Sequence, residues 1–422
     1  MPAFWSWSHA ISSFYKALQY FSTDSMALFR RLLGRGAPSL VANVQSVAFS
    51  SGVEATFQTK EFKLHRIDSG PSTEATVNRD EALQYYRQMQ MLRRMETAAG
   101  NLYKEKKIRG FCHLYMGQEA CAVGVKAAMS DLDSVITSYR CHGWIYIMGG
   151  TVTEVLAELT GRQSGNVHGK GGSMHMYKPN FYGGNGIVGA QCPLGAGVAF
   201  AYKYRGDPAV CITMYGDGAA NQGQLYEAVN MAKLWNLPCI FVCENNGYGM
   251  GTSAERSSAS TEYYARGDYI PGIWIDAMDV LAVREGMKWA KQYCVEGNGP
   301  VMVEFATYRY SGHSMSDPGT SYRTRAEIQE VRKSRDPITG FKDRIVTAQL
   351  ASEDELKEIE KEVRKEVDSA LKEATSAAEI PVDAAYMDVY ADSDYVVRGV
   401  SADHVIAPQP TTTQQYMQQL KA

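Results

Sequence analysis

The stretch from Ala209 to Thr252 constrains the fold most, because two short apolar runs flank one amphipathic segment. The first run ends at Gly216-Asp217-Gly218, and the second, Cys239–Cys243, ends at Glu244-Asn245-Asn246. This pattern predicts a strand, a helix and a second strand, with Pro238 ending the helix. Such a unit is a right-handed crossover between parallel strands. Both polar turns are therefore expected at the carboxyl edge of one sheet, where open α/β sheets bind ligands.

The two polar turns carry oxygen ligands that suit a magnesium ion. Asp217 offers a carboxylate, Asn246 an amide oxygen and Tyr248 a backbone carbonyl, a set in which one ligand is charged. Gly216 and Gly218 allow backbone to approach a diphosphate closely. Each turn alone is equally typical of an ordinary loop. Together, 246 − 217 = 29 residues apart, they resemble the thiamine diphosphate signature that begins with GDG and closes on NN.

Composition excludes several function classes. The chain has 422 residues, of which 45% are hydrophobic, and a net charge of −3, so it can bury a large core and shows no basic character typical of nucleic-acid binding. It has no apolar run of about 18 residues, which predicts no membrane span. Its eight cysteines form no C-x-x-C pair, a pattern that favours buried free thiols in a reducing compartment.

The first 60 residues differ from the rest. They contain five basic and two acidic residues, with an arginine-bearing amphipathic stretch from Met26 to Arg35. This composition is typical of a mitochondrial transit peptide, with a disordered tail as the alternative and Met26 as an alternative start. We therefore expect a transit peptide and N-terminal extension over 1–60, a folded domain over 61–400 and a polar C-terminal tail over 401–422.

Periodicity predicts an α/β fold with a mostly parallel sheet and helices on both faces. Helices are expected over 79–107, 120–129, 196–204 and 278–294, and a capping box at Ser352-Glu-Asp-Glu355 opens another long helix. A buried strand over 300–308 would run parallel to the first two strands.

Further polar residues follow the predicted strands. Tyr139 and Arg140 follow a short strand near Ile136, and Arg309 and His313 follow the strand over 300–308. An arginine at a strand end suits a diphosphate or carboxylate. The Ser-, Gly- and Pro-rich loop after Arg309 predicts mobility and a phosphorylation target, with an ordinary solvated loop as the alternative.

The glycine-dense region 161–197 contains Gly184–Gly189, which matches the dinucleotide fingerprint GxGxxG. No strand is expected before it, and the acidic residue that should follow would be Asp207, which lies in a turn. The pattern therefore favours a loop that covers a large cofactor, and a dinucleotide-dependent oxidoreductase is a distant alternative.

Seven motifs then resemble one family. These are GFCHLYMGQEA, SYRCHGW, GKGGSMHMY, FYGGNGIVGAQ, GDGAANQGQ, ENNGYGMGT and RYSGHSMSDPGTSYRT. They are similar to the alpha-subunit family of pyruvate dehydrogenase (acetyl-transferring), the first component of the mitochondrial pyruvate dehydrogenase complex. The resemblance runs unbroken from Lys60 to Val400. It implies a thiamine-diphosphate-binding fold, a mitochondrial matrix location, and an α₂β₂ heterotetramer with the cofactor between an alpha and a beta subunit.

The resemblance also implies roles for single residues. Magnesium would be held by Asp217, Asn246 and the Tyr248 carbonyl. The cofactor would be contacted by Tyr139, Arg140, Gly186, Val188, Gly218, Ala219 and His313, with Arg309 close by. His113 would face pyruvate, and His113 and His313 are candidates for proton transfer, because a histidine titrates near neutral pH. A regulatory kinase and phosphatase would act on Ser314 and Ser321, with Ser253 as a third site.

By the same resemblance, the chain would help decarboxylate pyruvate and transfer the acetyl unit to the lipoyl group of dihydrolipoyl acetyltransferase, which feeds acetyl-CoA production. The cofactor ring would serve as the electron sink. The glutamate that activates this ring lies on the beta subunit in the family, so this chain would form half of an active site. The alternatives are a branched-chain 2-oxo acid dehydrogenase alpha subunit and a catalytically silent subunit that binds magnesium and diphosphate for regulation.

The chain departs from the family pattern at two positions. Ser311 stands where family members usually carry histidine, and Met116 stands where they usually carry an acidic residue. Neither position is a predicted metal ligand. We expect an effect on regulation or on pyruvate handling, and Ser311 is a hypothetical additional phosphate acceptor.

Overall fold

The computed structural model describes residues 53–382 together with Ala384 and Gln418. Apart from Gln418, the predicted tail over 401–422 lies outside the described residues, as does most of the predicted transit segment. Residues 54–58 of that segment form strand β1 (Glu54–Gln58), which pairs antiparallel with β3 (Glu74–Asn78). The transit peptide itself stays a prediction.

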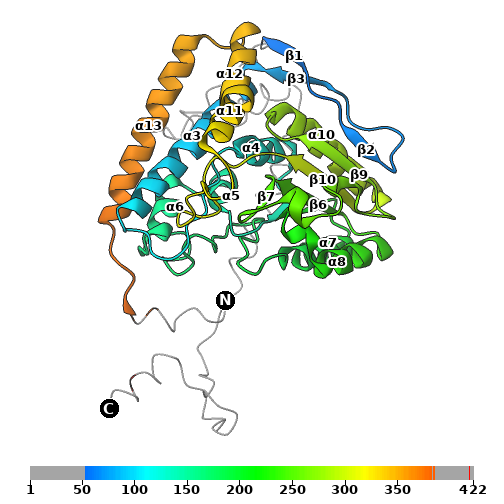
Figure 1. The fold of residues 1–422 in the computed structure, drawn as a ribbon, viewed down its shortest axis with the longest axis horizontal. Coiled ribbons are helices and arrows are strands. Elements are labelled where there is room, and N and C mark those ends of the chain that lie inside the picture. Colours follow the sequence, from blue (N-terminus) through cyan, green and yellow to red (C-terminus); the bar gives the residue numbers. More distant parts are fainter. Residues whose placement is uncertain (1–52, 383, 385–417, 419–422) are drawn as a thin grey trace, which may run out of the picture. The chain divides into compact units, whose positions relative to one another are not determined.

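A six-stranded sheet forms the centre of the described domain (Figure 1). Its strands, in spatial order, are β2 (Lys63–His65), β9 (Gly272–Asp276), β10 (Val301–Ala306), β6 (Cys239–Asn245), β5 (Cys211–Gly216) and β4 (Ser134–Ile136). All neighbouring pairs are parallel except β2 and β9 at one edge. This confirms the mostly parallel sheet, whereas the sequence patterns did not identify β2 or β9 as strands.

Helices cover both faces of the sheet because its strands are buried on both sides. Alternate side chains of β5 separate the two faces: Cys211 and Tyr215 pack toward helices α7 (Gln191–Arg205) and α8 (Gly223–Leu234), and Ile212 lies in the other core cluster. That second core includes α4 (Glu119–Ala128) and α10 (Val280–Tyr293) (Figure 1). The predicted α/β architecture is confirmed.

Helix α7 begins at Gln191, five residues before the predicted start at Ala196. Pro193 lies in its first turn, where the missing N–H is not needed for an intrahelical hydrogen bond. Helix α8 begins at Gly223, after a short 3₁₀ turn over Ala219–Asn221, so Asn221 precedes the helix.

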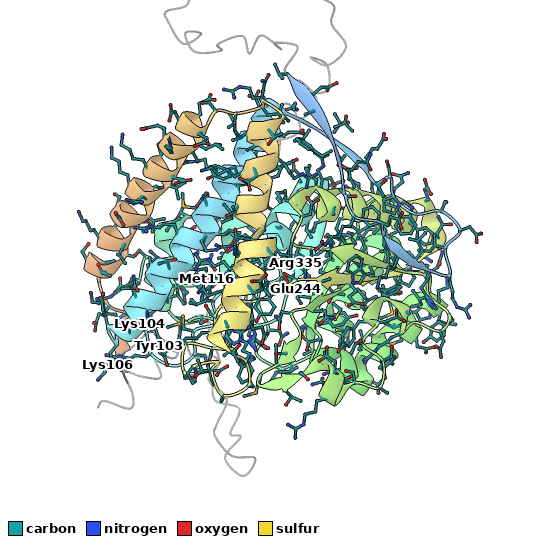
Figure 2. The ribbon with its side chains drawn as sticks, turned by 45° about the horizontal axis from the view of Figure 1, so that its top comes forward. Tyr103, Lys104, Lys106, Met116, Glu244 and Arg335 are labelled. Atoms are coloured by element: carbon teal, nitrogen blue, oxygen red, sulfur yellow. The ribbon has the colours of Figure 1, made fainter. Side chains whose placement is uncertain are left out.

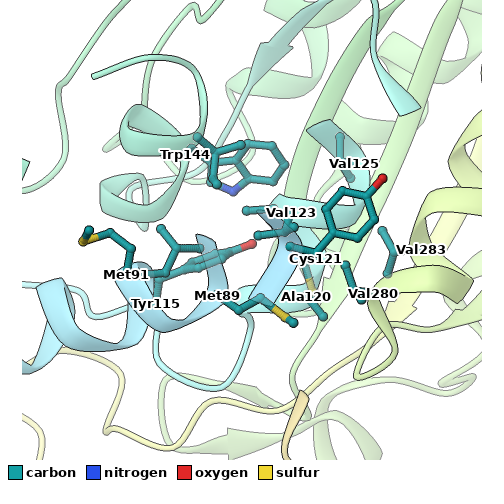
Figure 3. Close-up of a cluster of buried hydrophobic side chains, with 14 of the residues drawn as sticks. Met89, Met91, Tyr115, Ala120, Cys121, Val123, Val125, Trp144, Val280 and Val283 are labelled. Atoms are coloured by element: carbon teal, nitrogen blue, oxygen red, sulfur yellow. The ribbon is translucent and has the colours of Figure 1, made fainter. Parts of the chain in front are cut away.

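Helices α3 (Arg79–Lys104) and α13 (Glu353–Ser376) lie side by side (Figure 1). The capping box predicted for α13 is present, since Ser352 and Glu355 exchange side-chain and backbone hydrogen bonds. The inner face of α3 joins α4 and α10 in one buried cluster, in which Figure 3 labels Met89, Met91, Ala120, Cys121, Val123, Val125, Tyr115, Trp144, Val280 and Val283.

The remaining elements are short or peripheral. The helices are α5 (His142–Ile147), α6 (Val152–Leu159), α9 (Ala254–Ser257), α11 (Arg325–Arg335) and α12 (Pro337–Thr347), and the strands β7 (Tyr248–Gly249) and β8 (Thr252–Ser253) form a small hairpin. All eight cysteines are free and buried, as predicted. Within the described ranges, no helix has the length and apolarity needed to span a membrane.

Candidate functional site

The ends of β5 and β6 meet at one edge of the sheet and open into a cavity of about 260 Å³, here called the inner cavity. In the strand register Gly216 pairs with Glu244, so Asp217 and Asn246 follow on neighbouring strands. The lining residues are Gln118, Ser138, Tyr139, Arg140, Val188, Gln191, Gly216, Asp217, Gly218, Ala219, Glu244, Asn246, Tyr248, Gly249, Met250 and His313. Nine of the eleven residues predicted to contact cofactor or metal lie in this lining, the exceptions being Gly186 and Arg309.

A second, outer cavity of about 680 Å³ adjoins the first and shares Tyr139, Val188, Met250 and His313 with it. Its other lining residues are Phe111, His113, Met174, Gly186, Gly251, Ser314, Ser316, Asp317, Pro318, Ser321 and Tyr322. The structure thus brings His113, Gly186 and two of the three predicted phosphorylation sites to the mouth of the inner cavity.

Besides Gln191 Oε1, two oxygens of residues that line the inner cavity are buried without a hydrogen-bond partner. These are Asp217 Oδ2 and Asn246 Oδ1. The Asn246 amide orientation follows from its Nδ2, which donates to Gln118 Oε1 at 3.2 Å. Since buried polar atoms are normally satisfied, this pair fits a hard cation that takes oxygen ligands.

Of the three predicted metal ligands, only Asp217 carries a carboxyl group. Burial raises the pKa of Asp217 to about 6, and the positive charge of Arg309 opposes that rise. No group of three or more His, Cys, Asp or Glu side chains is placed to hold a metal among the described residues. A metal here would therefore need neutral oxygens and ligands from outside the chain, such as water or phosphate.

Two arginines contribute positive charge to this site: Arg140 lines the inner cavity, and the charge of Arg309 acts on Asp217. Arg140 Nη1 and Nη2 donate to the carbonyls of Leu114 at 2.6 Å and His313 at 2.9 Å. Arg309 is fully buried behind the cavity wall, where Nη2 donates to Met250 O at 2.6 Å while Nε and Nη1 have no partner. Burial and the nearby Arg140 lower the pKa of Arg309 to about 10. The site therefore combines positive charge with unused donors, as an anionic ligand requires.

The backbones of the two polar turns touch across the inner cavity. A Cβ on Gly218 would lie 3.3 Å from the Cα of Gly249, so a side chain at position 218 would push the turns apart. Gly218 thus permits a close approach between two turns of the protein, and the approach of its backbone to a diphosphate stays a prediction.

Three aromatic rings meet where the two cavities join. The His113 ring lies 4.5 Å from Tyr139 and 5.2 Å from His313, measured between ring centroids, and Tyr139 lies 5.4 Å from His313. Burial, and then Arg140, lower the pKa of His113 to about 2 and that of His313 to about 4. Both imidazoles are therefore neutral near pH 7 in this chain, which differs from the expectation that they titrate near neutral pH.

Sequence reasoning missed Glu244, which is labelled in Figure 2. Its Oε1 accepts hydrogen bonds from Tyr115 Oη at 2.5 Å and from Gln118 Nε2 at 3.2 Å. Burial raises its pKa to about 7. Its position at the end of an apolar strand was the available signal.

The predicted serine loop is fixed at both ends. Asp317 accepts hydrogen bonds from the N–H of His313 at 2.7 Å, the N–H of Gly319 at 2.8 Å and the Tyr322 hydroxyl at 2.5 Å. Arg323 donates to the carbonyls of Arg309 and Ser311. These hydrogen bonds join the loop to itself and to Arg309, and the mobility predicted from the sequence stays a prediction.

The three serines predicted as phosphorylation sites differ in exposure. Ser314 is only 6% exposed and its Oγ lies 2.8 Å from Ser316 Oγ, whereas Ser321 is exposed. Ser253 caps helix α9 by accepting a hydrogen bond from the N–H of Arg256 at 3.3 Å, and it pairs with Tyr248 in the small hairpin. Access to Ser314 therefore requires the loop to open.

Residues 87–383 match the family described as dehydrogenase E1 component. The chain is 69% identical over 392 residues to "Probable pyruvate dehydrogenase E1 component subunit alpha, mitochondrial" of Caenorhabditis elegans, covering 92% of this chain and 97% of that relative. It is also 69% identical to an Ascaris suum type II alpha subunit, covering 81% and 87%. The human somatic-form alpha subunit is 55% identical, covering 89% and 97%.

Proposed function

The chain belongs to the dehydrogenase E1 component family, and on this premise we propose that it is the alpha subunit of a mitochondrial pyruvate dehydrogenase. Its reaction is the decarboxylation of pyruvate with transfer of the acetyl unit to the lipoyl group of dihydrolipoyl acetyltransferase. The observation that carries this proposal is identity of 69% over 92% of the chain to a relative named as such an alpha subunit. The mitochondrion is the location in the names of these relatives, and the matrix is the compartment we propose.

The family binds thiamine diphosphate, whose thiazolium ring supplies the nucleophile and the electron sink for decarboxylation. The inner cavity fits the diphosphate end of this cofactor. Asp217, Asn246 and the Tyr248 carbonyl would hold Mg²⁺, supported by the two unpaired buried oxygens. Gly218 and Ala219 would contact the diphosphate through backbone, and the charges of Arg140 and Arg309 would offset its negative charge.

The other predicted contacts surround the junction of the two cavities. Tyr139, Val188 and His313 line both cavities, and Gly186 lines the outer one. His113 and His313 present neutral imidazoles there, which can orient the pyruvate carboxylate and hold or accept a proton. Because both rings are packed against Tyr139, their orientations are restricted before substrate arrives.

The site is incomplete in this chain alone. Apolar side chains at the mouth of the cavities remain uncovered, with Ile187 72%, Met250 65% and Phe111 60% exposed. We expect the beta subunit of an α₂β₂ heterotetramer to cover them and to supply the carboxylate that activates the cofactor ring. We expect the lipoyl domain to bind at this same opening, once the beta subunit has completed it.

Regulation by phosphorylation forms part of the proposal. Ser314 and Ser321 line the outer cavity and Ser253 lies beside Tyr248. A phosphate on any of them would bring a charge of about −1.5 to −2 near an anionic cofactor and is expected to inhibit. A kinase and a phosphatase would control this charge.

The test is reconstitution of the chain with a pyruvate dehydrogenase beta subunit. We expect pyruvate-dependent CO₂ release that requires thiamine diphosphate and Mg²⁺, and no activity from the chain alone. A higher kcat/KM for 3-methyl-2-oxobutanoate than for pyruvate would favour the branched-chain alternative. Unchanged activity of an Asp217→Asn tetramer would favour a catalytically silent chain.

A further inference from the structure

Three buried polar side chains outside the cofactor cavity form one hydrogen-bonded line. Glu96 comes from α3, His142 opens α5, and Ser173 lies in the glycine-dense region before α7. His142 Nδ1 lies 3.0 Å from Glu96 Oε2, and His142 Nε2 lies 2.8 Å from Ser173 Oγ. Glu96 and His142 are fully buried, and Ser173 is nearly so. The order of groups is that of a serine-histidine-acid triad.

The contacts of the triad define its hydrogen-bond directions. Glu96 Oε1 already accepts from the backbone N–H of Tyr115 at 2.9 Å, so its other oxygen is the natural acceptor for His142 Nδ1–H. His142 Nε2 is then the acceptor for the Ser173 hydroxyl, and Ser173 Oγ accepts from the backbone N–H of His113 at 3.2 Å. With Nδ1 as donor and Nε2 as acceptor, each of these groups has a hydrogen-bond partner.

A hydrolytic role does not fit this triad. Neither the inner nor the outer cavity is lined by Ser173, His142 or Glu96. The hydroxyl oxygen is also occupied by the His113 N–H, so no substrate carbonyl has access to it. The triad is therefore expected to hold other residues of the protein in place.

Both ends of the triad hold the same short backbone segment, His113–Tyr115. Ser173 takes the N–H of His113, Arg140 takes the Leu114 carbonyl at 2.6 Å, and Glu96 takes the N–H of Tyr115. The Tyr115 hydroxyl in turn donates to Glu244 on the inner cavity wall. A fully satisfied buried network of this kind rigidifies the segment that it holds.

We propose that Glu96, His142 and Ser173 are positioning residues that fix the His113 imidazole at the mouth of the cofactor cavity. The proposal rests on the function proposed above, in which His113 faces pyruvate. His113 needs such support because its ring is held only by packing: Nδ1 is buried without a hydrogen-bond partner, and Phe111 and His313 flank the ring. Without the triad, the backbone N–H of His113 would be unpaired and the ring free to shift.

The first test compares two buried serines in the reconstituted α₂β₂ enzyme. Ser173→Ala is expected to lower kcat/KM for pyruvate about tenfold, because it leaves a buried N–H without a partner. The affinity for thiamine diphosphate with Mg²⁺ should change less than about twofold, since the diphosphate contacts are untouched. Ser134→Ala is the matched control, because Ser134 is fully buried and its hydroxyl has no hydrogen-bond partner. Ser173→Thr, which restores a hydroxyl, should recover most of the activity.

A double-mutant cycle separates positioning from general stability. If the triad acts through His113, Ser173→Ala should have almost no further effect on kcat/KM in a His113→Ala background. Glu96→Gln should behave in the same way. The two carboxylate oxygens of Glu96 accept from Tyr115 N–H and His142 Nδ1–H, whereas an amide has one accepting oxygen and one NH₂ group that donates. Additive losses in either double variant, or equal losses for Ser173→Ala and Ser134→Ala, would overturn the proposal.

Activity of the unmodified tetramer and the double-mutant cycle together separate the positioning role from the proposed function. If the unmodified tetramer releases no CO₂ from pyruvate, the function is wrong, and the triad variants are not needed to show it. If the unmodified tetramer is active and the cycle is additive, the function stands and the positioning role is wrong.

Discussion

The hydroxyl of Ser311 donates a hydrogen bond to the sulfur of Met116, with 3.7 Å between Oγ and Sδ. The N–H of Tyr310 donates to the Met116 carbonyl at 2.9 Å, so the two segments lie in direct contact (Met116 is labelled in Figure 2). These are the two positions at which the resemblance led us to expect a departure from the family pattern. The expected departures would then form one coupled change, in which two uncharged side chains meet at positions where the resemblance implies histidine and an acid.

This coupling predicts the behaviour of a double substitution. Ser311→His alone places an imidazole against a thioether in a half-buried position and should destabilise the domain by about 1–2 kcal/mol. Adding Met116→Asp supplies the missing acidic partner and should recover about 1 kcal/mol beyond the sum of the single effects. Urea unfolding of the tetramer measures all three variants. Ser316→His, at an exposed position of the same loop, is the control. Strictly additive free energies would show that the two positions are independent.

Asp217 provides a prediction about stability without ligand. Burial raises its pKa from the usual 3.8 to about 6, so ionisation of Asp217 costs the folded state about 3 kcal/mol at pH 7.5. This cost develops as the pH rises from 3.8 to about 6 and is constant above that. Asp217→Asn removes that cost and should raise the melting temperature of the metal-free protein while abolishing decarboxylation. Glu227→Gln, at an exposed position of helix α8, controls for the loss of one negative charge. A metal-free Asp217→Asn protein that melts below the unmodified one would contradict the burial argument.

The same carboxyl group predicts how magnesium affinity depends on pH. Protons compete with Mg²⁺ for Asp217, so the affinity should be nearly constant above pH 6 and should fall about tenfold per unit below it. Calorimetric titration of the tetramer with Mg²⁺ in the presence of thiamine diphosphate, between pH 5 and 8, measures this slope. The same titration of free thiamine diphosphate corrects for protonation of the cofactor. A flat profile down to pH 5 would mean that Asp217 does not bind the metal as an ionised carboxylate.

Asp317 predicts that the serine loop contributes to cofactor binding. Asp317→Ala removes the acceptor of the His313 N–H, the Gly319 N–H and the Tyr322 hydroxyl, so the loop should open and the Kd for thiamine diphosphate should rise about tenfold or more. Phosphorylation of the buried Ser314 should become faster, while that of the exposed Ser321 should change little. Phosphopeptide analysis over time measures both rates. Equal acceleration at both serines would indicate general unfolding of the loop instead.

Local patterns in the sequence were sufficient to predict the sheet edge that forms the site. Strand-length apolar runs, the glycine turn after β5 and the asparagine turn after β6 predicted where Asp217 and Asn246 lie, because a parallel crossover has one geometry. The capping box at Ser352 was equally reliable, because its hydrogen bonds span three residues. Strands β2 and β9, of three and five residues, were missed.

The sequence by itself determined the family, the α/β fold and the residues at the ends of the strands, since these depend on short-range rules and on recognisable motifs. Only the tertiary structure decided the protonation of His113 and His313, because burial and the charge of Arg140 lower their pKa values. It alone revealed the contact of Ser311 with Met116 and the line from Glu96 through His142 to Ser173. These side chains are far apart in the sequence, and a hydrogen bond between distant segments leaves no periodic signal, so it forms only when the packed core brings its partners together.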